Sequence, residues 1–293
     1  MQFLLTNNII MNTFKKISIL SMFFIFILSY SQEGEKDKLI ADFTYLLKAK
    51  IYKSTPNYSH EELFSLQVLN DRAFFISEKA VKFDSIFQKE FQKATIGGNN
   101  NVNFKGMSFP KTKFPYTIIQ SNNDIQYFER IGMTLLSYKE PIVTNWKLIN
   151  ESKVINSFNC KKAEINYKGR NWIAWYSTEI PIAYGPYKFT GLPGLIIKIS
   201  DKTGDYDYEL VKSISTDNLK GMVSRVNKLR YENAKETTLI SLQEAKKNFT
   251  NNLIGSLASM NTTVPAESME NLRNIQKQKQ QNLADENPIE LSY

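Results

Sequence analysis

Residues able to carry out chemistry are few in this chain of 293 residues. Hydrolysis by a serine or cysteine nucleophile needs a neighbouring base and donors for the developing oxyanion. The only histidine, His60, lies in the polar segment 56–62, where nothing signals a catalytic partner. Ser177 follows Trp175 and Tyr176 but lacks the flanking glycines of a nucleophile elbow. We therefore expect His60 at the surface and no marked catalytic residue.

Metal and phosphate sites have equally little support. One His and one Cys cannot form a zinc site unless carboxylates supply most of the ligands. Asp201, Asp205 and Asp207 could gather oxygens around calcium, but the spacing lacks the distal Glu of a calcium loop, and a polar hairpin turn is preferred. Gly191 and Gly194 are not followed by the Lys and Ser or Thr of a phosphate-binding loop. The expectation is no metal and no cofactor.

An aromatic group in the Gly- and Pro-punctuated segment 172–201 is the strongest candidate for a binding site. Its members are Trp172, Trp175, Tyr176, Tyr184, Tyr187 and Phe189. These side chains either pack as core or line a hydrophobic groove for a lipid, a peptide or a partner segment. Core is the favoured interpretation, because buried aromatic residues are commoner than ligand cages.

The elements that would position these residues are mainly strands. Alternation of apolar and polar residues predicts extended segments at 39–52 and 61–76. Residues 78–94 have helical spacing and predict an amphipathic helix, followed by a loop over 95–115. Further antiparallel strands are expected at 116–120, 125–129, 146–152, 162–167, 171–177, 195–200 and 206–213. Pro193–Gly194 is expected to form a type II turn before the strand 195–200.

The C-terminal part, 241–293, is predicted to be a polar helical tail. Ser241 and Glu244 have the spacing of a capping box, and residues 267–284 form a second, more polar helix candidate. The expected fold is thus α+β and mainly β: a large, curved, half-barrel-like antiparallel sheet, with one amphipathic helix after the first strands and helices at the C-terminus. Residues 32–293 are expected to form a single domain.

The N-terminus has the features of a cleaved signal peptide over residues 1–31, with Met11 as a plausible start. Two lysines precede an apolar run, 17–28, of about 12 residues, which is too short to span a bilayer stably. Ser29 and Ser31 then provide small residues before a cleavage site. The single cysteine, Cys160, excludes an internal disulfide, and the dispersed basic residues of a chain with net charge +8 do not favour nucleic-acid binding.

The segment 191–196 resembles the defining motif of the GLPGLI family of secreted Bacteroidetes proteins. The motif residues are Gly191, Leu192, Pro193, Gly194, Leu195 and Ile196. Gly169–Arg170, Asp201 and the ending Asn287–Leu291 also resemble the family. The resemblance implies an exported protein and a structural motif, and it identifies no catalytic residue.

Together these features predict an exported periplasmic or secreted protein with a non-enzymatic binding or accessory role. Its concave aromatic face would hold an apolar small ligand or part of an envelope protein. Two alternatives stay open. One is a cell-envelope hydrolase with an unmarked serine or carboxylate, and the other is a purely structural motif with the interaction surface elsewhere, such as the polar C-terminal helix.

Overall fold

The structure, a computed structural model, describes residues 37–96, 106–214, 216–259 and 266–292, and strands are the commonest regular element in these ranges. In chain order they are β1 (Ala41–Ala49), β2 (His60–Val68), β3 (Arg72–Ser77), β4 (Thr117–Ser121), β5 (Asp124–Ile131), β6 (Thr134–Pro141), β7 (Lys147–Ile155), β8 (Phe158–Tyr167), β9 (Arg170–Ser177), β10 (Leu195–Asp201), β11 (Tyr206–Ile214) and β12 (Lys235–Glu236). The helices are α2 (Glu78–Ile96), α3 (Leu239–Asn251), α4 (Leu253–Ser259) and α5 (Ala266–Asp285), with short 3-10 turns at Thr216–Leu219 and Lys228–Arg230.

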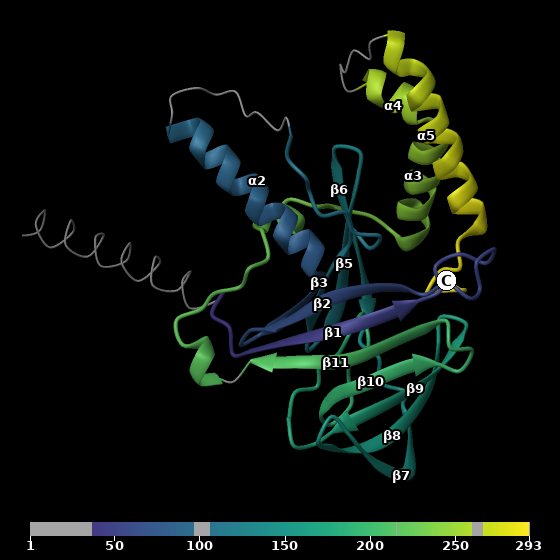
Figure 1. Ribbon diagram of the computed structural model, residues 1–293. Coiled ribbons are helices and arrows are strands. Elements are labelled where there is room, and N and C mark those ends of the chain that lie inside the picture. Colours follow the sequence, from purple (N-terminus) through teal and green to yellow (C-terminus); the bar gives the residue numbers. More distant parts are fainter. Residues whose placement is uncertain (1–36, 97–105, 215, 260–265, 293) are drawn as a thin grey trace, which may run out of the picture.

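All twelve strands belong to one open sheet in the order β12-β6-β5-β4-β3-β2-β1-β11-β10-β9-β8-β7 (Figure 1). Neighbouring strands pair antiparallel, except that β12 runs parallel to β6. The predicted mainly β fold is confirmed, and β6 and β12 are additions to the expected strands. The predicted signal peptide, 1–31, and part of the predicted loop 95–115 lie outside the described residues.

The sheet curls until strands far apart in its order come together. β6 stands second in the order and β8 eleventh. Nevertheless, Nζ of Lys168, in the turn between β8 and β9, lies 2.9 Å from a carboxylate oxygen of Glu140 in β6. This contact shows that the sheet is strongly curved, with a concave face that resembles a half barrel.

The main core lies on the concave face. Along β1, Phe43, Tyr45 and Leu47 are buried while Lys48 is exposed, as expected for a strand with one face in the core. Helix α3 covers part of this face through Leu242. The irregular segment 178–194, between β9 and β10, fills much of the rest and leaves the concavity packed with the protein's own side chains.

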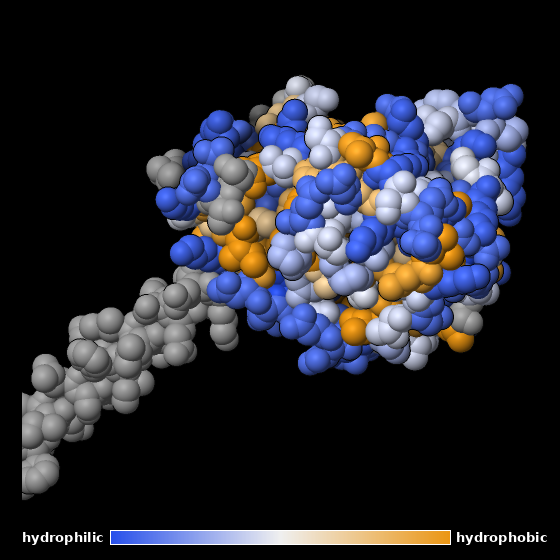
Figure 2. All heavy atoms as spheres, turned by 90° about the horizontal axis from the view of Figure 1, so that it is seen from below, coloured by the Kyte–Doolittle hydropathy of each residue, from blue (hydrophilic) through white to orange (hydrophobic). Residues whose placement is uncertain are grey.

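The convex face is partly covered and partly open to solvent. Phe74 and Ile76 of β3 pack there against Ala80 and Val81 of α2 in a second, smaller core. On β10 and β11 the same face has ion pairs, such as Lys198 with Asp207 and Glu209. The surface seen from below shows hydrophobic patches separated by hydrophilic side chains (Figure 2).

Helix α3 begins two residues before the predicted N-terminus. Thr238 is its N-cap, because the Thr238 side chain accepts a hydrogen bond of 3.1 Å from the Ser241 amide. Ser241 is therefore already inside the helix, and the predicted capping box with Glu244 is wrong. The long polar helix α5 packs against α3 and α4 (Figure 1). No helix in the described part of the chain is both long and apolar enough to cross a membrane.

Candidate functional site

Four of the six predicted aromatic residues lie together in the concave core. The Phe189 ring, fully buried, lies 4.6 Å from the Trp172 ring and 6.1 Å from the Tyr187 ring, measured between centroids. Tyr176 is buried in the same cluster. Such tilted contacts are typical of packed aromatic cores. This arrangement supports the interpretation of these four residues as core.

The other two predicted residues, Trp175 and Tyr184, also contact this core, but each makes a polar contact of its own. Trp175 is three positions from Trp172 on the same strand, so alternation turns its side chain to the convex face. There the ammonium of Lys153 lies 3.9 Å from the centroid of the Trp175 ring, a cation–π contact. Tyr184 is half-buried, and its hydroxyl donates to the Asn122 side chain at 3.3 Å. The six residues therefore do not share one face, and a binding role for them stays a prediction.

The GLPGLI motif brings the backbone into close contact with neighbouring segments. A Cβ on Gly191 would lie 2.2 Å from the carbonyl oxygen of Val143, and one on Gly194 would lie 2.1 Å from that of Ser177. Gly191 also has a φ of +83°, which favours glycine. Gly194 lacks a positive φ, so the predicted type II turn is wrong, and its glycine serves close packing instead. The apolar motif residues Leu192, Leu195 and Ile196 are buried.

Buried side chains hold the segment 178–194 against the sheet. The amide of Gln120, on β4, donates to the carbonyls of Gly185 and Tyr187 at 2.7 and 2.6 Å. The indole N–H of Trp146 donates to the carbonyl of Thr190 at 2.7 Å. Because a segment without regular structure must satisfy its backbone groups by other means, these bonds fix its path across the concave face.

The same segment contains a buried lysine that sequence reasoning missed. The Lys188 side chain is fully buried. Its ammonium donates to the Tyr138 hydroxyl at 2.8 Å, to Glu290 at 2.6 Å and to Glu140. Lysine is almost never fully buried unless it is paired, and these three partners meet that condition. A Lys between two aromatic residues in an apolar segment was the signal that could have found it.

Three tyrosine rings surround the Lys188 ammonium. Their centroids lie 5.3 Å (Tyr127), 4.9 Å (Tyr138) and 5.4 Å (Tyr187) from Nζ. Burial raises the pKa of all three phenols well above the ordinary value of 10. The phenols are therefore neutral at physiological pH, and the rings attract the cation through their faces.

Glu140 joins this buried lysine to a second one nearer the surface. Burial alone would raise the pKa of Glu140, but the ammonium groups of Lys188 and Lys168 outweigh that effect and hold the pKa below 4.5. The Lys168 ammonium lies 2.9 Å from the second carboxylate oxygen. Glu140 is therefore ionised at neutral pH.

Backbone strain accompanies the buried lysine. Tyr187 has a φ of +56°, a region that bulky residues rarely adopt. The residues 187–189 are nevertheless all buried. A regular strand would send Lys188 to the opposite face from its two neighbours, and the left-handed conformation at Tyr187 interrupts that alternation. Strain of this kind costs about 1–3 kcal/mol and concentrates at functional sites.

The C-terminal tail, residues 286–292, closes the concave face beside Lys188. Arg170, almost fully buried, donates to the Asn287 side chain at 2.6 Å and to the Pro288 carbonyl at 2.8 Å. The Tyr187 hydroxyl donates to Glu290 at 2.7 Å, and the Leu291 amide donates to the Lys168 carbonyl at 2.8 Å. Residues that resemble the GLPGLI family thus meet here, although more than a hundred residues of chain separate them.

The Asp201–Asp205 segment forms the polar hairpin turn that was the preferred interpretation. One Asp201 oxygen accepts the amides of Asp205 and Tyr206 at 2.8 and 2.9 Å, and the other accepts Arg170 at 2.7 Å. These donors occupy the oxygens that calcium would need. In the described ranges, no three or more His, Cys, Asp or Glu side chains are arranged to hold a metal ion.

His60 is not the surface residue predicted from the sequence. Its side chain is 13% exposed, and Nε2 lies 3.0 Å from Glu62, two residues along β2 and on the same face. The buried Glu62 carboxylate also accepts the Ser77 hydroxyl at 2.5 Å, the Lys79 ammonium at 3.1 Å and the Thr112 hydroxyl. In a serine–histidine–acid triad the histidine lies between the other two residues. Here Glu62 lies between Ser77 and His60, so this cluster does not have the arrangement of a triad.

Glu62 should make stability depend on pH. Burial opposes its ionisation, but the hydrogen bonds from Ser77, Thr112, His60 and Lys79 outweigh burial and lower the pKa from 4.5. A lowered folded-state pKa contributes stability above the unfolded-state pKa, and that contribution is lost as the pH falls through the folded-state value. We expect Glu62→Gln to cost about 2 kcal/mol at pH 7 and less at pH 3, measured by urea unfolding.

The matched control for this substitution is Glu61→Gln. Glu61 is adjacent on β2, is mostly exposed and pairs with the exposed Lys48 at 3.4 Å. Exposed ion pairs contribute little, so its cost should stay below about 1 kcal/mol at both pH values. A Glu62→Gln cost that does not change between pH 7 and pH 3 would contradict the assignment.

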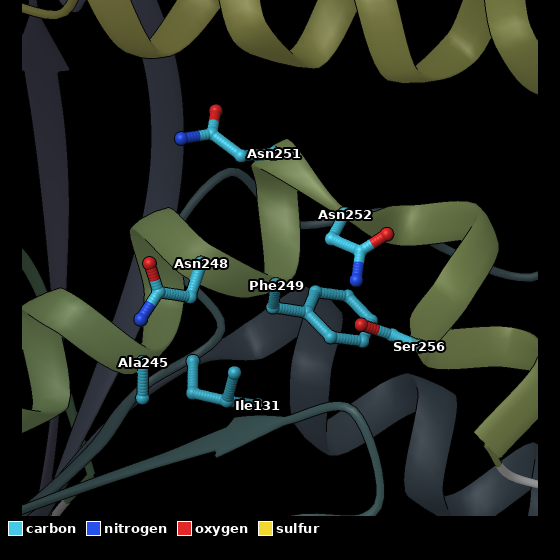
Figure 3. Close-up of a pocket in the computed structure, with 7 residues that line it drawn as sticks. All are labelled: Ile131, Ala245, Asn248, Phe249, Asn251, Asn252 and Ser256. Carbon is cyan, nitrogen blue, oxygen red and sulfur yellow. The ribbon is translucent and has the colours of Figure 1, made fainter.

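An open groove of about 520 Å³ lies between the β5 end of the sheet and the C-terminal helices (Figure 3). Its apolar lining comes from Ile131 at the end of β5 and from Ala245 and Phe249 on α3. Its polar lining is formed by Asn248, Asn251, Asn252 and Ser256. The Phe249 ring lies between Asn248 and Ser256, while Asn251 lies apart, on the side of α5 (Figure 3). The groove combines an apolar floor with side-chain amides that both donate and accept hydrogen bonds.

Residues 165–198 match the model of a family described as a protein of unknown function (Porph_ging). The matched stretch runs from the end of β8 to β10 and includes Lys188 and the GLPGLI motif. No curated protein matches the sequence.

Three solved structures are similar to the chain at low identity. Two are structures of PNGF-II, in space groups P21 (15% identity, TM-score 0.45) and C2 (13% identity, TM-score 0.47); each alignment covers 70% of this chain and 32% of the other. The third is a LolA superfamily protein, NE2245 from Nitrosomonas europaea, at 8% identity and a TM-score of 0.23, covering 63% of this chain and 90% of the other. The chain thus spans about a third of the PNGF-II chains it matches.

Proposed function

We propose that this chain is an exported, GLPGLI-type protein of the periplasm or cell envelope, with a non-enzymatic binding role. Residues 1–31 would be its signal peptide and residues 32–293 one domain. The leader-like N-terminus and the unaltered motif 191–196 support export and the family resemblance. The match of residues 165–198 to a family of unknown function is compatible with both.

The open groove under α3 and α4 is the observation that supports a binding role. The concave face, where the aromatic residues were expected to receive a ligand, is filled by the segment 178–194 and the C-terminal tail. The groove is open instead, with Phe249 as an apolar anchor and the amides of Asn248 and Asn252 beside it. Side-chain amides match the donors and acceptors of a peptide backbone. We therefore propose a peptide segment of an envelope partner protein, with apolar side chains, as the occupant.

The hydrolase alternative has less support. Ser177 is fully buried on β9, where its hydroxyl accepts the Glu179 amide at 3.3 Å. Ser77 is also fully buried and donates to Glu62. A nucleophile must reach its substrate, and neither serine is placed to do so.

Phe249→Ala tests the groove. Peptides selected from a random phage-displayed library on the intact mature chain should bind this variant about 30-fold more weakly, because an aromatic anchor contributes about 2 kcal/mol. Ile240→Ala is the matched control, since Ile240 lies on the same helix, is 61% exposed and is not part of the groove lining. Its affinity should stay within about twofold. Fluorescence anisotropy of the labelled peptides measures both.

Three outcomes would count against the proposal. The library could yield no enriched peptide, or the selected peptides could bind both variants equally well. Retention of a lipid by the intact chain, seen by native mass spectrometry and lost in Phe249→Ala, would assign the groove to a different occupant. Far-UV circular dichroism of both variants shows that the fold is retained.

A further inference from the structure

The buried charges around Lys188 are not equally matched. Glu140 has two cationic partners, Lys188 and the less buried Lys168, whose ammonium lies 2.9 Å away. Among the described residues Glu290 has one, Lys188, with Nζ 2.6 Å from Oε1. If Glu140 is assigned to Lys168, then Lys188 and Glu290 remain as one positive and one negative charge facing each other in the core.

Such a pair is costly to keep buried as ions. Removing an ammonium and a carboxylate from water costs several kcal/mol per ion, and their attraction repays this only in part. An amide between the same two groups carries no charge and releases one water. Proximity also favours the reaction, because two groups held in contact react with very high effective concentrations. Both side chains are at least nine-tenths buried, and three tyrosine rings surround the amine.

We propose that Lys188 and Glu290 form an intramolecular isopeptide bond. Nζ of Lys188 bonds to Cδ of Glu290, and the bond between that carbon and one carboxylate oxygen breaks. The ammonium provides three protons: one stays on the amide nitrogen and two leave with the oxygen as water. Glu140 accepts a proton from the ammonium, passes protons to the leaving oxygen and ends as the carboxylate that it was at the start. The reaction consumes no co-reactant.

Each neighbouring group has a placement that suits its part in this reaction. Glu140 is in hydrogen-bond contact with the Lys188 ammonium, as a proton acceptor must be. The Tyr187 hydroxyl donates at 2.7 Å to Oε1 of Glu290, where negative charge develops as the amine adds. The strained backbone at Tyr187 allows this hydroxyl and the Lys188 amine to meet at one carboxylate.

The bond would also fulfil a structural need. A chain with a single cysteine cannot form an internal disulfide, the usual covalent brace of exported proteins. A link between residues 188 and 290 would fix the C-terminal tail across the concave face. The inference is independent of the proposed binding role of the groove.

Intact-mass spectrometry of the purified, unaltered chain tests the proposal directly. With the mature N-terminus determined, the chain should weigh about 18 Da, one water, less than its sequence predicts. Trypsin cannot cleave at an acylated Lys188, so digestion should give fragment 171–198 joined to fragment 280–293. Lys188→Met should have its full calculated mass. Most molecules of the Glu140→Gln variant should have their full calculated mass, because the bond forms slowly without this carboxylate.

The full calculated mass for the unaltered, folded chain would overturn the proposal, whatever the variants do. Joining of fragment 171–198 to the fragment 140–147 would assign the bond to Glu140 and overturn the choice of Glu290. If every molecule of the Glu140→Gln variant lacked the mass of one water, the role given to Glu140 would be overturned. Because the first measurement needs no substitution, a variant that fails to fold does not weaken the test.

Discussion

Lys188→Met is expected to lower the free energy of unfolding by about 3–5 kcal/mol at pH 7. The substitution keeps an unbranched side chain of similar length but removes the amine that neutralises the buried Glu290, whether as an ion pair or as the proposed amide, and it removes one of the two described cationic partners of Glu140. A buried carboxylate without a partner is far more costly than the loss of the pair as a whole. Guanidinium unfolding, followed by tryptophan fluorescence, measures the difference.

The control and a double variant separate charge from packing. Lys198→Met removes a lysine that is 28% exposed and pairs with Asp207 and Glu209 on the convex face, so it should cost less than about 1 kcal/mol. Adding Glu290→Gln to Lys188→Met removes the uncompensated carboxylate and should recover part of the loss. A Lys188→Met chain within about 1 kcal/mol of the unaltered protein would show that the buried charges are not coupled as described.

Gly191→Ala and Gly194→Ala should each cost about 3 kcal/mol or more, because the added Cβ overlaps backbone that cannot move without disturbing the sheet. The overlapped atoms are the carbonyl oxygens of Val143 and Ser177, at 2.2 and 2.1 Å. At Gly191 the left-handed conformation adds about 1–2 kcal/mol. Thermal unfolding followed by circular dichroism measures both changes.

Gly204→Ala is the control for these two substitutions. Gly204 also has a positive φ, +70°, but a Cβ there would meet nothing within 4 Å. Its cost should be the conformational term alone, about 1–2 kcal/mol. If Gly204→Ala destabilised the protein as much as Gly191→Ala, the glycine at position 191 would be required for its backbone conformation and not for close packing.

The sheet could be predicted because most of its strands have a clear alternation. β8 and β11 alternate over several residues, and the turns at Lys168–Gly169 and Asp201–Asp205 separate them from their neighbours. β6 was missed because Leu135 and Leu136 are apolar on both faces, which removes the period of two. The two-residue strand β12 is too short for any pattern to indicate.

The candidate site could be predicted only in part. The motif and the aromatic residues are local features, but the direction of the Lys188 side chain depends on the left-handed backbone at Tyr187, which sequence pattern does not specify. Glu290 reaches Lys188 from 102 residues away, so no local spacing relates them. His60 and Glu62 are different: two residues apart on one strand, they share a face, and that spacing could have indicated their contact.

Hydrogen exchange of the C-terminal tail tests most directly whether the concave face is closed by the protein's own chain. The Asn287 amide donates to the Ile51 carbonyl at 2.9 Å, and the Leu291 amide donates to the Lys168 carbonyl at 2.8 Å. If the tail closes the core, both amides should exchange as slowly as those of β1 in the intact chain. Exchange of both within seconds, as in a free peptide, would show an open concave face and return the six aromatic residues to consideration as a ligand site.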